Sequence, residues 1–266
     1  KVLTLRTGVA TSAGLTLASS SFVAAVSVAN FVLGDTAWIA ILVGGLLCTL
    51  AAFCFSELNG LLPSAAGIRL YFNRAFNDRV SLTVSILYML VVIVGVVGAE
   101  SYVLSTLLSD VIPAVPPYVW IVLMLLLVTG MNIRGIKIAG IFQDIITYGL
   151  MFSMLAMGLI ALFKVDFQLN APLSPGGATG IISAVAVGVF LFVGFEWVTP
   201  LAEEVTQIRQ ISRGMMAALG ILSVIYAIFT TAMTATVPKE VLASFAAPHL
   251  VFARAVLGGA GVTWMT

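Results

Sequence analysis

The chain has 266 residues, of which 61% are hydrophobic and only 9% are charged, and its formal net charge is +1. A soluble domain carries about 25% charged residues, so this composition cannot supply a water-facing surface and excludes a soluble globular protein. The small net charge gives no reason to expect a nucleic-acid partner. Apolar runs of about 18 residues or more, long enough to cross a bilayer, recur along the sequence and predict an all-α polytopic membrane protein.

Glycine, proline and charged residues divide the chain into eight apolar segments, each predicted to form a transmembrane helix. In chain order these helices are expected at residues 8–33, 37–62, 81–108, 118–134, 139–163, 179–202, 213–237 and from Leu250 onward. The last segment is expected to be truncated at Thr266.

Lysine and arginine are distributed unequally between the two sides of the predicted membrane. If the N-terminus is cytoplasmic, nine basic residues lie inside and only Lys164 and Lys239 lie in outer loops. The inside set is Lys1, Arg6, Arg69, Arg74, Arg79, Arg134, Lys137, Arg209 and Arg213. We therefore expect a multi-pass protein of the cell's inner membrane with a cytoplasmic N-terminus.

Two of the predicted helices contain residues that weaken a membrane helix. The first contains GLTLASSSFVAAVSVANF, where Ala18–Ser21 interrupt the large apolar side chains, and the sixth contains GVFLFVGFEWVTP, with Gly188, Gly194 and Pro200. Small residues also allow close helix packing, which is the alternative interpretation of both segments. If both helices unwind, they expose NH groups and carbonyls that suit the carboxylate and the amine of an amino acid.

The two interrupted helices lie five helices apart, and an odd number of crossings inverts the second relative to the first. Interruptions at matching positions of two inverted halves indicate the binding site of a secondary transporter.

Glu196, Glu100 and Asp144 are among the acidic residues that lie within the apolar runs. Glu196 follows AVGVFLFVGF, where a charge costs about 2.5 kcal/mol or more in a bilayer, so it is expected to face a partner or a cavity. Glu100 is interpreted as a second proton site, a substrate contact, or the partner of a hydroxyl or a helix-end backbone group. Asp144 is expected to cap its helix or to pair with Lys137.

Several motifs resemble those of the amino acid, polyamine and organocation (APC) transporter family. They are GFE at Gly194–Glu196, LAEEV at Leu201–Val205, FSELNGLLPSAAG at Phe55–Gly67 and NIRGIK at Asn132–Lys137. The resemblance implies the five-plus-five inverted-repeat (LeuT-like) fold with broken helices 1 and 6. Residues 1–163 then form the first repeat with helices 1–5, and residues 164–266 form part of the second, with helices 6–7 and the start of helix 8.

The resemblance also implies a substrate site. Its helix 1 break would fall on residues 18–22, where the backbone NH groups of Ser19, Ser20 and Ser21 would hold a substrate carboxylate. The substrate amine would meet carbonyls near Thr16 and Phe190, and Phe190 would also act as an aromatic gate.

Three further residues complete the expected site. Gly194 would lie at the helix 6 break. Glu196 resembles a gating carboxylate that takes up a proton, with a static pair inside the bundle as the alternative, and Glu100 is a second candidate for gating or proton coupling. A lysine that several family members carry in helix 5 is replaced by Gly149 or Leu150, so the coupling ion, a proton or sodium, stays open, and no cofactor or metal is expected.

The function predicted from these features is secondary active transport, by symport or exchange, of a small amino acid through alternating access. The alternative is a transporter of polyamines or other organic amines. An enzyme is not expected, because no nucleophile–base pair or metal-ligand spacing is visible at lipid depth. The expected partners are the substrate, membrane lipid and, as an option, further copies of the chain in a homo-oligomer.

Overall fold

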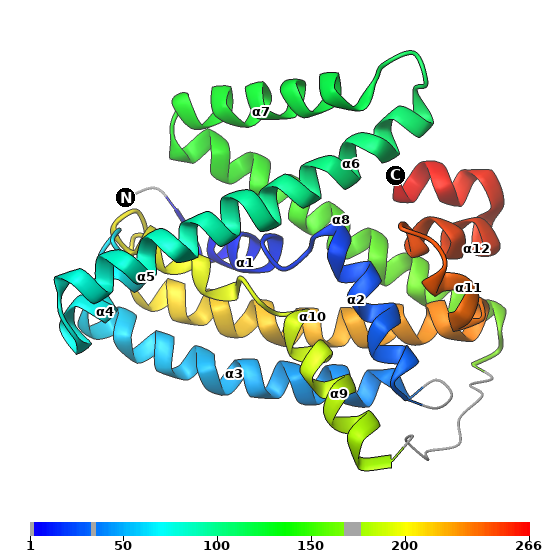
Figure 1. Cartoon of the computed structure of the whole chain (residues 1–266), viewed down its shortest axis with the longest axis horizontal. Helices are drawn as coiled ribbons and strands as arrows, with labels where there is room; N and C mark the ends of the chain where they lie inside the picture. The colour runs from blue at the N-terminus through cyan, green and yellow to red at the C-terminus, as the bar shows by residue number, and fades with distance from the viewer. Residues whose placement is uncertain (1–2, 33–35, 168–176) are drawn as a thin grey trace.

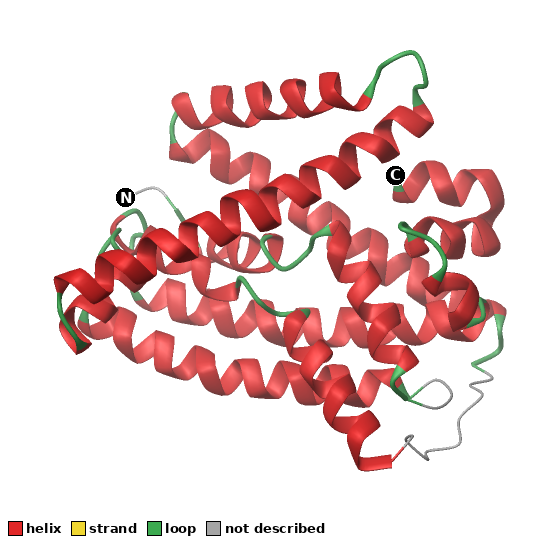
Figure 2. Ribbon diagram, in the orientation of Figure 1, coloured by secondary structure: helices red, strands yellow, loops and turns green. Residues whose placement is uncertain are grey.

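The computed structural model describes residues 3–32, 36–167 and 177–266. Across these ranges the chain forms helices joined by short loops (Figure 2), and the one β-type pairing is an isolated bridge between Leu3 and Val205. The all-α prediction is confirmed for the described residues.

The helices keep the order expected from the sequence (Figure 1). They are α1 (Leu5–Gly14), α2 (Ser19–Asn30), α3 (Ala37–Leu61), α4 (Ile68–Ala75), α5 (Asp78–Leu90), the π-helix η1 (Val91–Val97), α6 (Gly98–Val111), α7 (Pro117–Ile133), α8 (Ile136–Lys164), α9 (Gly177–Phe190), the 3-10 helix η2 (Phe195–Glu203), α10 (Arg209–Thr236), α11 (Lys239–Ala243) and α12 (Pro248–Met265).

Five helical stretches of the described chain are long and apolar enough to cross a membrane. They are Ala37–Leu61, Asp78–Val111, Ile136–Lys164, Ala178–Glu203 and Arg209–Thr236, while Ser20–Asn30 and Pro117–Ile133 are apolar but shorter. These spans support a polytopic membrane protein.

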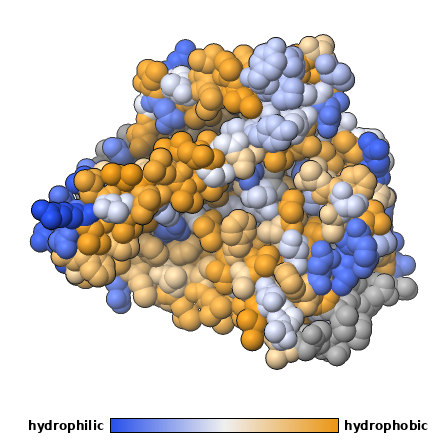
Figure 3. Space-filling view, viewed as in Figure 1, coloured by the Kyte–Doolittle hydropathy of each residue, from blue (hydrophilic) through white to orange (hydrophobic). Residues whose placement is uncertain are grey.

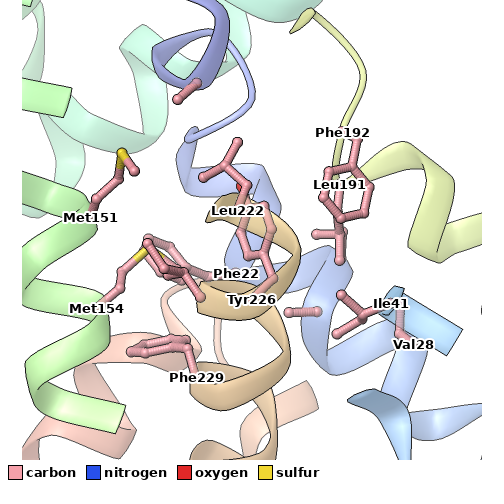
Figure 4. Close-up of a cluster of buried hydrophobic side chains, with 14 of the residues drawn as sticks. Phe22, Val28, Ile41, Met151, Met154, Leu191, Phe192, Leu222, Tyr226 and Phe229 are labelled. Carbon is pink, nitrogen blue, oxygen red and sulfur yellow. The ribbon is translucent and has the colours of Figure 1, made fainter. Parts of the chain in front are cut away.

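Helix α10 lies at the centre of the bundle and packs against α1, α3 and α8. In its most apolar 18-residue window 67% of the residues are buried, against 6% for the stretch Asp78–Val111. Figure 4 shows the aromatic side chains of α10, Tyr226 and Phe229, among Phe22 of α2 and Met154 of α8. The core therefore joins the half-helix α2 to α8 and α10.

The outer surface is largely apolar. Figure 3 shows hydrophobic side chains spread over the stretch that contains α5 and over α7. Large side chains there are well exposed, among them Val94 at 71% and Leu126 at 64%. A soluble monomer rarely exposes a patch of this extent, whereas a membrane protein presents it to lipid.

Close helix packing explains one of the glycines in the predicted helix 6. A Cβ atom built on Gly44 of α3 would lie 2.7 Å from the carbonyl carbon of Gly188 in α9. Two helix backbones approach this closely only where both lack side chains. Gly188 therefore fits the packing interpretation, while the helix is interrupted at residues 191–194, which end at Gly194.

Both predicted helix interruptions are present, but the first is displaced from the expected residues. The chain is non-helical at residues 15–18, between α1 and α2, and helix resumes at Ser19. The expectation that the break falls on residues 18–22 is therefore wrong by about three residues. The reason is capping: the Ser21 hydroxyl oxygen accepts a hydrogen bond from the Ala18 NH at 3.3 Å, so the serine run starts a helix.

Candidate functional site

The two interrupted helices touch at their breaks. Gly194 has φ +109°, and a Cβ atom added to it would lie 3.3 Å from both the Cβ atom and the carbonyl oxygen of Leu15. Nearby, the buried hydroxyl of Ser12 donates to the carbonyl of Phe195 at 2.8 Å. The break between α1 and α2 therefore lies against the break between α9 and η2, and the two backbones are in contact (Figure 1).

The carbonyl of Thr16, at the centre of the first break, is held by two hydroxyl groups. It accepts hydrogen bonds from Ser21 Oγ at 2.6 Å and from Tyr226 Oη at 2.7 Å. A carbonyl oxygen has two lone pairs, so these donors occupy both. A substrate amine that uses this carbonyl must take the place of one of the two hydroxyls.

The N-terminus of α2 carries a carboxylate from another helix. The backbone NH of Ser20 donates to Oε1 of Glu100 at 3.1 Å, while the NH of Ser21 donates to the carbonyl of Ala18 at 3.0 Å. Ser19 is the first residue of α2. Glu100 and the serine run thus lie together, and a backbone NH at the start of α2 is one partner of the Glu100 carboxylate.

Glu196 is buried, with 9% of its surface exposed, and both of its carboxylate oxygens have partners. Oε1 accepts a hydrogen bond from Tyr88 Oη at 2.6 Å, and Oε2 accepts one from the backbone NH of Gly194 at 3.2 Å. The Tyr88 hydroxyl in turn accepts from Trp197 Nε1 at 2.5 Å, and the two rings stack with centroids 5.2 Å apart. Hydrogen bonds therefore connect Glu196 to the break between α9 and η2 and to α5.

A cavity of about 430 Å³ opens beside this carboxylate. Its walls come from the loop before α4 and from α4, α5 and η2; they are mainly apolar and include Glu196, Tyr88, Trp197 and Arg69. Both parts of the expectation for Glu196, a partner and a cavity, are met in this arrangement.

Phe190 is the last residue of α9, immediately before the second break, and 53% of its surface is exposed. Its carbonyl accepts a hydrogen bond from the NH of Val193 at 3.2 Å. Phe190 therefore lies at a helix end beside the second break, as the resemblance implied.

The tyrosines of the site were not predicted from the sequence. Tyr88 donates a hydrogen bond to Glu196, and Tyr226 donates one to the Thr16 carbonyl. In the sequence, neither tyrosine differs visibly from the other aromatic residues of the apolar runs. A buried tyrosine hydroxyl needs a hydrogen-bond partner, which is the signal that could have identified both.

A second polar contact joins α1 to α8. Asp144 lies 3.2 Å from Nε of Arg6, and not beside Lys137 as expected, and it accepts a weaker hydrogen bond from Thr7 Oγ1 at 3.4 Å. The hydroxyl of Tyr148 donates to the Arg6 carbonyl at 2.9 Å. These contacts join α1, the first half of the interrupted helix, to the uninterrupted helix α8.

Comparison with known proteins places the chain in a family. A profile described as "Amino acid permease" matches residues 3–266. The chain is 24% identical over 261 residues to the cationic amino acid transporter 3, mitochondrial, of Arabidopsis thaliana, with 90% of this chain and 43% of that protein covered. It is also 24% identical over 247 residues to the methylthioribose transporter of Bacillus subtilis (strain 168), covering 85% of this chain and 53% of that protein.

A human relative shows the same level of similarity. The Asc-type amino acid transporter 1 of Homo sapiens is 24% identical over 235 residues, which cover 81% of this chain and 44% of that protein. The chain thus spans about half the length of the curated relatives it matches. Because the family profile covers nearly every residue, the chain belongs to the amino acid permease family, within the APC transporters.

Proposed function

We propose that the protein containing this chain is a secondary active transporter that carries a small amino acid by symport or exchange. The observation that carries the proposal is the contact between the two helix breaks at Leu15 and Gly194. It brings helix ends, hydroxyls and a carboxylate close to one another inside an apolar bundle. A site of this kind suits a small zwitterion.

The proposed substrate contacts follow from this geometry. The NH groups of Ser19, Ser20 and Ser21 start a helix, whose N-terminus favours an anion, so they are assigned to the substrate carboxylate. The carbonyls of Thr16 and Phe190 are assigned to the amine.

Glu196 is proposed as the gating residue that responds to substrate or takes up a proton. Its carboxylate accepts the NH of Gly194 within the second break and the hydroxyl of Tyr88 on α5. A change in its charge would weaken both bonds and release η2 from α5. Transport would then proceed by rocking of the interrupted helices against the rest of the bundle.

The whole protein is proposed to have the five-plus-five inverted-repeat fold, with residues 1–163 as the first repeat and 164–266 as part of the second. It would lie in the cell's inner membrane with a cytoplasmic N-terminus, surrounded by lipid and with homo-oligomers as an option. The coupling ion is a proton or sodium.

One observation favours a second substrate class. Glu100 already places a carboxylate on the NH of Ser20, and Glu196 lies in the same region of broken helices. Two carboxylates near a site attract cations, so a polyamine or another organic amine is the alternative substrate. The relatives themselves differ in this respect, since one is a transporter of methylthioribose.

The test uses the full-length protein. Thermal stabilisation is measured against a panel of amino acids and amines, and each hit is examined for counterflow in liposomes, in the wild type and in Glu196→Gln. Saturable exchange of a small amino acid, with its pH dependence lost in Glu196→Gln, supports the proposal. Exchange of carboxylate-free amines alone supports the alternative, and the absence of saturable flux contradicts both.

A further inference from the structure

A π-helix accounts for the placement of Glu100. Tyr88 and Glu100 lie on one continuous helical stretch, twelve residues apart, and the π-helix Val91–Val97 lies between them. Twelve residues of regular α-helix at 3.6 per turn would leave the two side chains about 120° apart around the axis. If the π-helix absorbs one residue, the offset falls to about 20°.

This register lets one helical stretch reach both interrupted helices. Tyr88 contacts Glu196 beside the second break, and Glu100 contacts Ser20 just after the first. The π-helix between Tyr88 and Glu100 thus bears on which way Glu100 faces along this stretch.

The Ser20 NH that receives Glu100 is one of those assigned above to the substrate carboxylate. The N-terminus of α2 carries a partial positive charge that one carboxylate satisfies, and two carboxylates at the same NH groups repel each other. A substrate carboxylate must therefore displace Glu100 or share the helix end with it.

We infer that Glu100 determines substrate specificity by acting as an internal carboxylate that competes with the carboxylate of the substrate. This inference rests on the proposed function and deepens it. Glu100 lowers the affinity for ligands that present a carboxylate to α2, relative to the affinity for the corresponding carboxylate-free amines.

The experiment compares matched ligands on matched variants. Each amino acid that the wild type binds is paired with the amine that has the same side chain and lacks the carboxylate, and dissociation constants are measured on the full-length protein. The variants are Glu100→Gln, which keeps the shape and removes the charge, and Asp110→Asn as the control. Asp110 is an exposed acid on the same helix, so its change removes the same charge away from α2.

In Glu100→Gln we expect the dissociation constant of the amino acid, divided by that of the matched amine, to fall about tenfold. Asp110→Asn should change neither ligand. If Glu100→Gln does not fold, Glu100→Asp, which withdraws the carboxylate by one methylene, should still tighten the amino acid relative to the amine.

Two results overturn the inference in distinguishable ways. If the wild type exchanges a ligand but the ratio of the two dissociation constants stays unchanged or shifts toward the amine in both Glu100 variants, Glu100 is a helix cap or a partner of the substrate amine, and the proposed function stands. If the wild type binds neither ligand class, the proposed function fails and the inference falls with it.

Discussion

At the scale of single residues, the site depends on side chains and backbone groups that are each held by specific contacts. Gly194 holds a left-handed conformation against Leu15, and Glu196 is fixed by one hydroxyl and one backbone NH. A buried carboxylate with both oxygens bonded is stable in an apolar bundle, and it becomes a switch only when one of those bonds is lost.

Replacing Gly194 by alanine is expected to destabilise the protein by about 1 to 3 kcal/mol, because the residue has positive φ and its Cβ would press on the Leu15 backbone. Thermal unfolding in detergent measures the change. Gly149→Ala is the control, since Gly149 lies in α8 with nothing within 4 Å of an added Cβ and should be neutral or slightly stabilising. Equal melting temperatures for the two variants would contradict the contact between the breaks.

Tyr88→Phe removes one hydrogen bond from the Glu196 carboxylate and leaves Trp197 Nε1 without its acceptor. We expect a loss of about 1 to 3 kcal/mol in stability, together with a shift in the pH dependence of transport. Tyr102→Phe, at an exposed tyrosine of α6, serves as the control and should match the wild type. An unaltered pH profile in Tyr88→Phe would count against the gating part of Glu196.

At the scale of the elements, the helix from Asp78 to Val111 connects the two interrupted helices through its π-helical segment. Such segments are rare, and they often accompany functional sites because the extra residue shifts the faces of the helix on either side. With one residue absorbed by the π-helix, Tyr88 and Glu100 fall within about 20° of each other around the helix axis.

The alignment predicts that insertions and deletions within the π-helix have unequal effects. Deleting Val94 leaves eleven residue steps of regular α-helix from Tyr88 to Glu100, so the contacts of both side chains should be preserved. Inserting an alanine after Val94 instead rotates Glu100 by about 100°, away from α2. Ligand binding should survive the deletion and be lost on insertion. Loss of binding on deletion, with the insertion tolerated, would show that the π-helix does not set the direction of Glu100.

At the scale of the whole molecule, much of the architecture could be predicted from the sequence. Apolar length predicted the five long stretches that could cross a membrane, and glycine and small residues pointed to both interruptions. The position of the first break was displaced because Ser21 caps the start of α2, a local hydrogen bond that hydropathy does not report. The contacts of Tyr88, Tyr226 and Glu100 join residues far apart in sequence, so only the fold brings them together.

The central claim is that the crossing of the two breaks is a substrate site open to each side of the membrane in turn. It is tested most directly by labelling a cysteine placed at Ala18, in full-length protein with Cys54 replaced by serine, using an impermeant thiol reagent from either side. A cysteine at Ser244, exposed after α11, is the control. The account predicts labelling of position 18 from both sides and protection by the transported substrate, with no protection at position 244. Labelling of position 18 from one side only, unaffected by substrate, would contradict it.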